Sequence, residues 1–187
     1  ARAGYGSRRE IERWIVAGEL KINGKVPELG QQISAQDNVM LRGKVLNLQS
    51  RLRATPKVLA YHKQAGEMCT RDDPEGRTTV FSKLPHIGSG RWVMIGRLDV
   101  NTDGLLLFTT DGELANRLMH PSHEIEREYA SRILGEVDSD MLQRLTKGVE
   151  LEDGNAKFLR IKDAGGEGAN HWYHVVLAEG RNREVRR

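Results

Sequence analysis

The stretch GRLDVNTDGLLLFTTDGELANRLMHP, residues 96–121, is the part of the sequence that says most about the fold. Its middle, Leu105–Thr110, is an unbroken run of apolar and β-branched residues, which predicts a β-strand. The residues that follow, Asp111–Met119, repeat apolar side chains at helical spacing and stop before Pro121, which predicts a helix. Polar and glycine residues at 101–104 predict a turn that leads into the strand.

Asp99 is the residue of this stretch that could carry chemistry, because it lies where a predicted strand, Trp92–Leu98, enters the turn. A carboxylate at such a position is held on a rigid support and faces outward, as a nucleophile requires. The alternative is that Asp99 only caps the turn through its own backbone. The residues by themselves leave both interpretations open.

Residues 99–104 also resemble the opening of a calcium-binding loop, with acidic or amide side chains at alternate positions followed by Gly104. Thr110 occupies the position at which such a loop needs a bidentate carboxylate, and a strand pattern precedes the loop where the calcium motif needs a helix. Two histidine pairs have a possible zinc spacing but no cysteine near them, and they are better explained as structural or surface residues: His120/His123 and His171/His174. The sequence therefore predicts no metal site.

The distribution of charge along the chain favours a nucleic-acid partner. The 187 residues carry a formal net charge of +3, with 38% hydrophobic and 29% charged residues, as in a folded protein. The charge balance is +5 over residues 1–53, −5 over residues 54–179 and +3 over residues 180–187. Arginines outnumber lysines by 20 to 9, and guanidinium groups bind phosphates in forked pairs and stack on bases. A solvated surface with an accidental asymmetry is the alternative explanation.

Segments that would direct the chain to a membrane or out of the cell are not found in the sequence. No apolar run approaches the ~20 residues that a membrane span needs, and residues 1–12 do not resemble a signal peptide. The single cysteine, Cys69, excludes an internal disulfide and fits a reducing compartment. We therefore expect a cytoplasmic location without a membrane partner.

The amino-terminal segment predicts a helix followed by a hairpin. Ser7–Leu20 has an apolar face at helical spacing, and Ser7 with Glu10 forms the pattern of a capping box. Lys21–Val26 alternates around Asn23-Gly24, which predicts a tight turn between two short strands.

Further short strands are expected at 39–41 and 45–48, so that residues 1–50 form a small α+β module. Residues 51–57 lack apolar periodicity and predict a linker. Basic side chains of the module are expected to contact RNA phosphates: Arg8, Arg9, Arg13, Lys21 and Lys25.

Beyond the linker, strand patterns are more frequent than helical ones. Strands are expected at 58–62, 67–70 and 127–134, and at 156–161 and 171–177 as a hairpin joined by a glycine-rich loop. A further helix is expected at 139–147. Because strands and helices do not alternate regularly, the sequence predicts an α+β fold with a mixed, mainly antiparallel sheet flanked by helices.

Several segments together resemble the RsuA/RluB branch of the pseudouridine synthases. Residues 96–121 are similar to the signature of its catalytic domain, residues 179–187 (EGRNREVRR) to its carboxyl-terminal motif, and residues 127–129 (REY) to its tyrosine motif. Residues 1–9 (ARAGYGSRR), followed by the turn at 23–24, resemble an S4 RNA-binding domain. The resemblance covers essentially the whole chain, and the family pattern extends beyond both of its ends.

The resemblance implies an S4-like domain at 1–50, trimmed at its amino end, a linker at 51–57, and a pseudouridine synthase catalytic domain at 58–187, trimmed at its carboxyl end. The catalytic domain is expected to contain an RNA-binding cleft.

The resemblance also implies a role for each residue of the site. Asp99 corresponds to the nucleophile, and Arg186 to the basic residue that pairs with it and keeps it ionised. Tyr129 corresponds to the tyrosine that stacks on the target base, and Leu177 to the apolar residue that lines the base pocket. Arg97 lies two residues before the nucleophile, where related synthases insert a side chain into the gap left by the flipped base.

The activity implied by the resemblance is the isomerisation of a specific uridine to pseudouridine in large-subunit ribosomal RNA, by base flipping and without a cofactor. The expected partner is a ribosomal RNA stem-loop, free or within an assembling particle, and the protein is expected to be a monomer. Two alternatives stay open: the same chemistry on small-subunit ribosomal RNA, or a non-catalytic RNA-binding protein that assists ribosome assembly.

Overall fold

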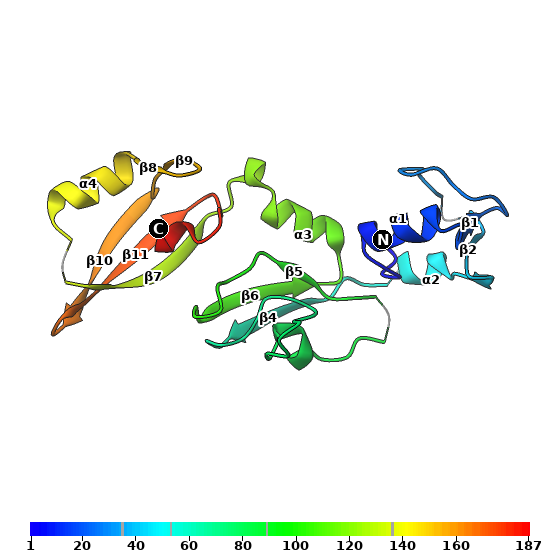
Figure 1. Ribbon diagram of the computed structural model, residues 1–187, viewed down its shortest axis with the longest axis horizontal. Helices are drawn as coiled ribbons and strands as arrows, with labels where there is room; N and C mark the ends of the chain where they lie inside the picture. The colour runs from blue at the N-terminus through cyan, green and yellow to red at the C-terminus, as the bar shows by residue number, and fades with distance from the viewer. Residues whose placement is uncertain (35, 53, 89, 136) are drawn as a thin grey trace. The chain divides into compact units, whose positions relative to one another are not determined.

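The structure, a computed structural model, describes residues 1–34, 36–52, 54–88, 90–135 and 137–187 (Figure 1). Arg53, in the predicted linker 51–57, lies outside the described residues. The chain divides into two units, Ala1–Asn116 and Arg117–Arg187, and the division falls within a helix.

The first helix, α1 (Arg8–Val16), begins at the predicted capping box. The Ser7 side chain accepts a hydrogen bond from the Glu10 amide at 3.2 Å, and the Glu10 carboxylate accepts one from the Ser7 amide at 3.1 Å. The predicted end at Leu20 is wrong, because Gly18 takes a φ of +68° and turns the chain out of the helix. Leu20 instead begins a strand.

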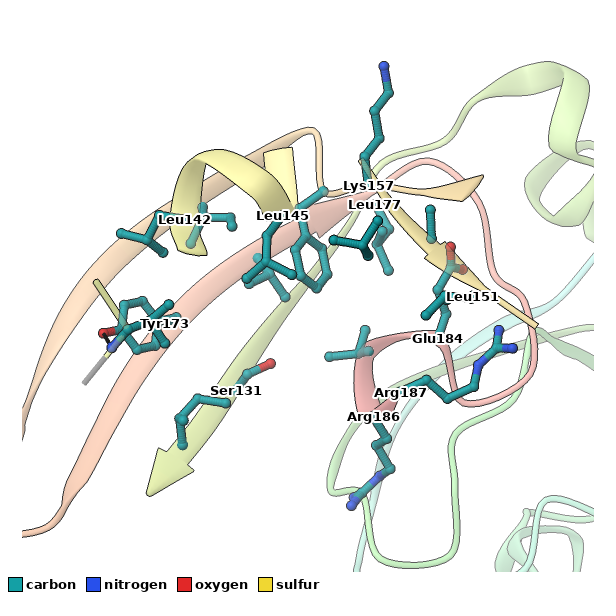
Figure 2. A pocket seen from close by; sticks show the side chains of 18 residues that line it. Ser131, Leu142, Leu145, Leu151, Lys157, Tyr173, Leu177, Glu184, Arg186 and Arg187 are labelled. Atoms are coloured by element: carbon teal, nitrogen blue, oxygen red, sulfur yellow. Dashed lines mark hydrogen bonds between the residues drawn. The ribbon is translucent and has the colours of Figure 1, made fainter. Parts of the chain in front are cut away.

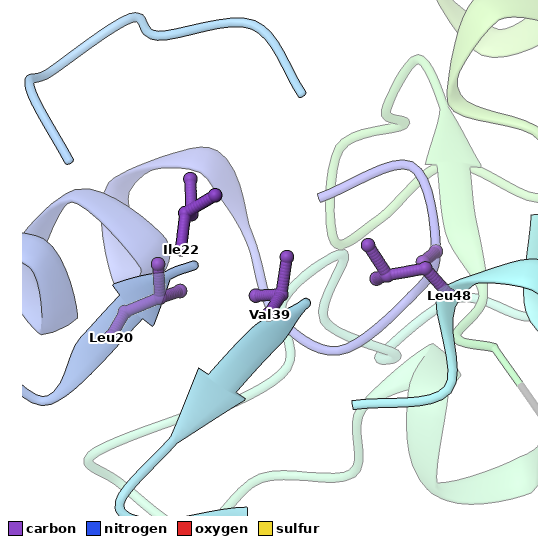
Figure 3. Close-up of a cluster of buried hydrophobic side chains, with 5 residues drawn as sticks. Leu20, Ile22, Val39 and Leu48 are labelled. Atoms are coloured by element: carbon purple, nitrogen blue, oxygen red, sulfur yellow. The ribbon is translucent and has the colours of Figure 1, made fainter. Parts of the chain in front are cut away.

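The amino-terminal sheet has the order β1-β2-β3, and all its neighbours are antiparallel. Its elements are β1 (Leu20–Ile22), β2 (Val39–Leu41) and β3 (Lys44–Val45), followed by α2 (Leu48–Leu52). The predicted turn at Asn23-Gly24 is present, but only one bridge, Ile22 to Lys25, pairs across it. A cluster of buried side chains packs these elements together, namely Ala3, Leu20, Ile22, Val39 and Leu48 (Figure 3).

The second sheet of the first unit has the order β4-β6-β5, again antiparallel. Its elements are β4 (Val58–Lys63), β5 (Val93–Ile95) and β6 (Gly104–Thr109), with the 3₁₀ helix η1 (Val80–Lys83) before β5 and α3 (Gly112–Met119) after β6. The structure confirms the strand predicted at 58–62, the strand predicted at 105–110 and the helix predicted at 111–119. The predicted strand at 67–70 is wrong, because only a single bridge joins Met68 to Thr79.

The core of this sheet is built around Phe108, which has an exposed fraction of 0%. Its ring packs edge-to-face on Tyr61 (ring centres 6.0 Å apart) and on Phe81 (5.4 Å). Leu106 and Thr109 are buried beside it, whereas Leu105 is exposed. This packing fixes β6, the strand that follows the Asp99 turn.

The second unit contains a sheet in the order β10-β11-β7 and a separate hairpin, β8-β9, all antiparallel. After the 3₁₀ helix η2 (Pro121–His123), the elements are β7 (Arg127–Leu134), α4 (Ser139–Lys147), β8 (Val149–Leu151), β9 (Gly154–Ala156), β10 (Arg160–Glu167), β11 (Asn170–Leu177) and the 3₁₀ helix η3 (Glu184–Arg186). Figure 1 shows α4 lying along one face of this sheet.

The strand at 127–134 and the helix at 139–147 agree with the sequence patterns. The predicted strand at 156–161 is wrong in its bounds, because Ala156 ends β9 and β10 begins only at Arg160. Antiparallel strands and a few short helices confirm the α+β class. Among the described residues, no helix has the length and apolar character needed to cross a membrane.

Candidate active site

Asp99 lies in the turn between β5 and β6, and its side chain is half-buried. Gly96 and Gly104 lie on either side of it, with φ values of +77° and +137° that glycine adopts without strain. The turn is closed by the backbone carbonyl of Asp99, which accepts a hydrogen bond from the Thr102 amide at 3.0 Å. The exposed side chain of Arg97 leaves the same turn two residues earlier.

A buried lysine holds the backbone of this turn. Lys63, the last residue of β4, has an exposed fraction of 0%. Its ammonium group donates to the carbonyls of Thr102 at 2.8 Å, Val100 at 3.1 Å and Gln64 at 3.0 Å. A buried ammonium group is costly unless its three donors are satisfied, and three carbonyl oxygens satisfy them here. The sequence patterns gave no sign of this role, because they ended the strand one residue earlier.

The turn that follows β4, residues 64–67, makes two further contacts with the Asp99 turn. The Gly66 amide donates to the carbonyl of Val100 at 2.7 Å, and the Ala65 amide donates to a carboxylate oxygen of Asp103. Together with Lys63, these bonds fix the backbone from residue 100 to residue 103. Asp99 therefore begins a segment held by its neighbours, as the support of a nucleophile requires.

Glu67 in turn stabilises residues 64–67, and its exposed fraction is 3%. Its carboxylate accepts hydrogen bonds from the Gln64 amide at 3.0 Å and the Tyr61 hydroxyl at 2.9 Å, and pairs with Lys83. Burial alone would raise the pKa of Glu67, but these donors hold it below its ordinary value. Burial, with the hydrogen bond to Glu67, raises the pKa of Tyr61 to about 12. At neutral pH the cluster thus contains an ionised Glu67 and a neutral Tyr61.

Lys63→Met is expected to lower the free energy of unfolding by about 1–3 kcal/mol, because the apolar side chain cannot donate to the buried carbonyls of the turn. Urea denaturation of the two proteins measures the difference. Lys57→Met, which removes an exposed lysine just before the same strand, is the control and is expected to change stability by less than about 0.5 kcal/mol. Equal losses in the two variants would contradict the role assigned to Lys63.

Tyr129 and Leu177 share one face of the sheet in the second unit. Tyr129 on β7 lies opposite Val175 on β11, and Leu177 lies opposite Arg127, so the four side chains are on the same side. Tyr129 is half-buried and Leu177 is 2% exposed. The Arg127 guanidinium donates to the carbonyls of Ala178, Ile125 and Leu118, which fixes the start of β7 next to the end of β11.

Leu177 and Arg186 also line one cavity of about 300 Å³ beneath α4 (Figure 2). Leu142 and Leu145 of α4 form part of its wall, and Tyr173 of β11 lines it as well. Tyr129 is not among its lining residues. The structure thus brings Leu177 and Arg186 together around a mostly apolar cavity.

The five basic residues expected to contact RNA phosphates all have exposed side chains. Arg9 and Arg13 are four residues apart on α1 and therefore neighbours on its surface. Lys21 lies at the middle of β1, and Lys25 follows the turn after it.

The predicted site residues are divided between the two units. Arg97 and Asp99 belong to residues 1–116, whereas Tyr129, Leu177 and Arg186 belong to residues 117–187. The pairing of Asp99 with Arg186 therefore stays a prediction. In the part of the chain that the structure describes, no three His, Cys, Asp or Glu side chains are placed to share a metal ion.

Comparison with protein families finds two matches. Residues 57–187 match the family described as RNA pseudouridylate synthase, and residues 1–39 match the S4 domain. A crystal structure of a pseudouridylate synthase superposes with a TM-score of 0.63 and 25% sequence identity, covering 100% of this chain and 78% of that chain.

Curated relatives named ribosomal large subunit pseudouridine synthase B are similar over the whole chain. Identity is 57% over 188 residues with the protein of Pseudomonas aeruginosa, 59% over 189 with that of Haemophilus influenzae and 57% over 189 with that of Escherichia coli K12. The chain spans 49%, 53% and 65% of the lengths of these relatives. With a family match over residues 57–187 and a matching fold, the chain belongs to the RNA pseudouridylate synthase family.

Proposed function

We propose that the protein isomerises a uridine to pseudouridine in large-subunit ribosomal RNA, with Asp99 as the nucleophile. The observation that carries this proposal is the similarity of the whole chain to relatives named as large-subunit synthases. The turn at Asp99, whose backbone is held by Lys63 and residues 64–67, supports the choice of nucleophile. The proposed substrate is an RNA stem-loop, and the proposed form of the enzyme is a cytoplasmic monomer.

The reaction exchanges one bond of the nucleotide for another. The bond between C1′ and N1 of uracil breaks, the base turns, and C5 bonds to C1′. N1 gains a proton and C5 loses one to solvent, so no atom other than hydrogen is exchanged with the surroundings. This exchange needs one carboxylate that attacks the nucleotide, at the sugar or at the base. It implies no redox or group-transfer cofactor.

The other residues of the proposed site lower the cost of presenting the base. Flipping a uridine out of a helix costs a few kcal/mol, and stacking on Tyr129 returns about 1–3 kcal/mol. Arg97 is proposed to fill the vacated position, and Leu177 to line the pocket of the base. Arg186 is proposed to pair with Asp99, because a guanidinium beside a carboxylate keeps that carboxylate ionised.

The purified protein is expected to release tritium from large-subunit ribosomal RNA labelled at C5 of uridine, because C5 loses its hydrogen when it bonds to C1′. The assay contains EDTA, and small-subunit RNA labelled in the same way is the matched substrate control. Sequencing of the product after pseudouridine-specific chemical modification is expected to place the new nucleotide at one position.

Three outcomes would contradict parts of this proposal. Tritium release from small-subunit RNA only would mean that small-subunit RNA is the substrate. Release only after metal is added back would contradict a reaction without metal. RNA binding without release from either RNA would favour a non-catalytic role in ribosome assembly, which the S4 domain match would also fit.

A further inference from the structure

The carboxyl-terminal turn of the second unit contains an arginine that the proposed mechanism does not use. We infer that Arg181 is a positioning residue for Arg186: it holds the turn from which Arg186 is presented. The inference deepens the proposed function and rests on it for its catalytic consequence.

Arg181 joins the carboxyl-terminal turn to the β8-β9 hairpin. Its guanidinium donates to the backbone carbonyls of Asn155 at 2.8 Å, Gly154 at 3.2 Å and Asp153 at 3.4 Å. The same group pairs with the carboxylate of Glu184 at 3.2 Å. Its side chain is 21% exposed, so little water competes for these bonds. One guanidinium therefore binds two segments that are more than twenty-five residues apart in sequence.

Glu184 makes this arrangement selective for one conformation of the turn. Its side chain is 4% exposed, and a carboxylate buried to that extent needs a charged or hydrogen-bonding partner. It accepts bonds from the Arg181 amide at 2.9 Å and from the Arg181 side chain at two nitrogens. Glu179 shares the same guanidinium at 3.2 Å. Burial and the neighbouring Glu184 raise the pKa of Glu179, so the cluster depends on the positive charge of Arg181.

The backbone between Arg181 and Arg186 needs such support. Arg183 has a φ of +52°, a left-handed conformation that is unfavourable for a residue with a side chain. The Arg183 carbonyl then accepts the Arg186 amide at 2.8 Å and closes η3. Conformations of this kind persist where surrounding contacts hold them, and the bonds between Arg181 and Glu184 span this residue.

Arg187 forms a second connection between the carboxyl-terminal turn and the β8-β9 hairpin. It forms a forked pair with Asp153, at 2.7 and 3.1 Å, on the same hairpin that Arg181 contacts. Figure 2 shows the side chains of Arg186 and Arg187 leaving η3 in different directions. Arg187 is bound to Asp153, so the position of the Arg186 side chain is set by the backbone of η3 and not by that pair.

Arg181→Lys tests the inference without removing a charge. A lysine keeps the positive charge but cannot reproduce the fork to three carbonyls and a carboxylate. We expect kcat to fall by about tenfold or more, because small displacements of a positioned group have effects of that size. We expect KM for the labelled RNA to change by less than about threefold, because a group that positions the reacting residues affects the chemical step and not RNA binding.

Rates are expressed per folded protein, with the folded fraction measured by circular dichroism, so that a general loss of stability does not count as a loss of positioning. Glu184→Gln, which removes the charge of the partner, is expected to lower kcat in the same way. Arg160→Met is the control, because Arg160, the first residue of β10, pairs with Glu126 just before β7. A kcat per folded protein that is unchanged in both Arg181→Lys and Glu184→Gln would overturn the inference.

Failure of the proposed function is distinguishable from failure of this inference. Wild-type protein that releases no tritium from any RNA would overturn the function. A crystal structure of Arg181→Lys supplies the readout that does not depend on activity, and a displaced η3 turn is expected in it. An unchanged turn with Arg183 still at positive φ would overturn the inference whatever the activity of the wild type.

Discussion

Asp99→Asn is expected to lower tritium release by about 10⁴-fold or more, with RNA affinity kept within a few-fold. The amide has the size and shape of the carboxylate, but it carries no negative charge and is not a nucleophile. Losses of this order follow when the attacking group of a covalent mechanism is removed. Single-turnover release from labelled ribosomal RNA measures the rate, and filter binding at fixed salt measures the affinity.

The matched control is Asp103→Asn, in the same turn. Asp103 accepts a hydrogen bond from the Ala65 amide, and asparagine keeps an oxygen for that bond. This variant is therefore expected to retain most of the activity. If Asp99→Asn turned over at a rate near that of the wild type, another group would have to be the nucleophile. If both variants lost activity equally, the result would point to the conformation of the turn and not to the chemistry of Asp99.

The elements that the sequence predicted well are those whose local signals agree with their packing. β7 and α4 have long periodic patterns, and Asp138 caps α4 through a 2.7 Å bond to the Met141 amide. The strand expected at 67–70 failed because Glu67 packs inward to bind Tyr61 and Lys83, so its burial reflects an ion pair and not a sheet. The strand expected at 156–161 was wrong in its bounds because pairing partners are not readable from one segment.

The candidate site was predictable only where a motif marked it. Asp99 lies in a stretch that resembles a family signature. Lys63 has no such mark in the sequence, because the carbonyls of Val100 and Thr102 that it binds come close to it only in the folded protein. The role of Arg181 likewise depends on the β8-β9 hairpin, some 26 to 28 residues away in sequence. Contacts of this kind are set by tertiary structure, which no local pattern encodes.

The combined variant Arg8→Gln/Arg9→Gln/Arg13→Gln is expected to bind ribosomal RNA roughly tenfold or more weakly at moderate salt, with unchanged kcat at saturating RNA. The three side chains are exposed on α1, and glutamine has nearly the same helix propensity as arginine, so the helix is expected to persist. Each lost contact with a duplex phosphate reduces the slope of log affinity against log salt by about 0.9, which gives a reduction of up to about 2.7 for three contacts. Binding measured between low and high potassium chloride gives the slope.

Arg77→Gln is the control for this experiment, because Arg77 is already paired with Asp73 at 2.8 Å and Glu75 at 3.0 Å. Neutralising it is expected to leave the slope almost unchanged, since an arginine bound to two carboxylates releases few counterions from RNA. A triple variant with the wild-type slope would show that α1 does not contact phosphates. A triple variant with the wild-type slope and affinity but reduced kcat would assign these arginines to catalysis, and the division of labour between the S4 domain and the catalytic domain would then be wrong.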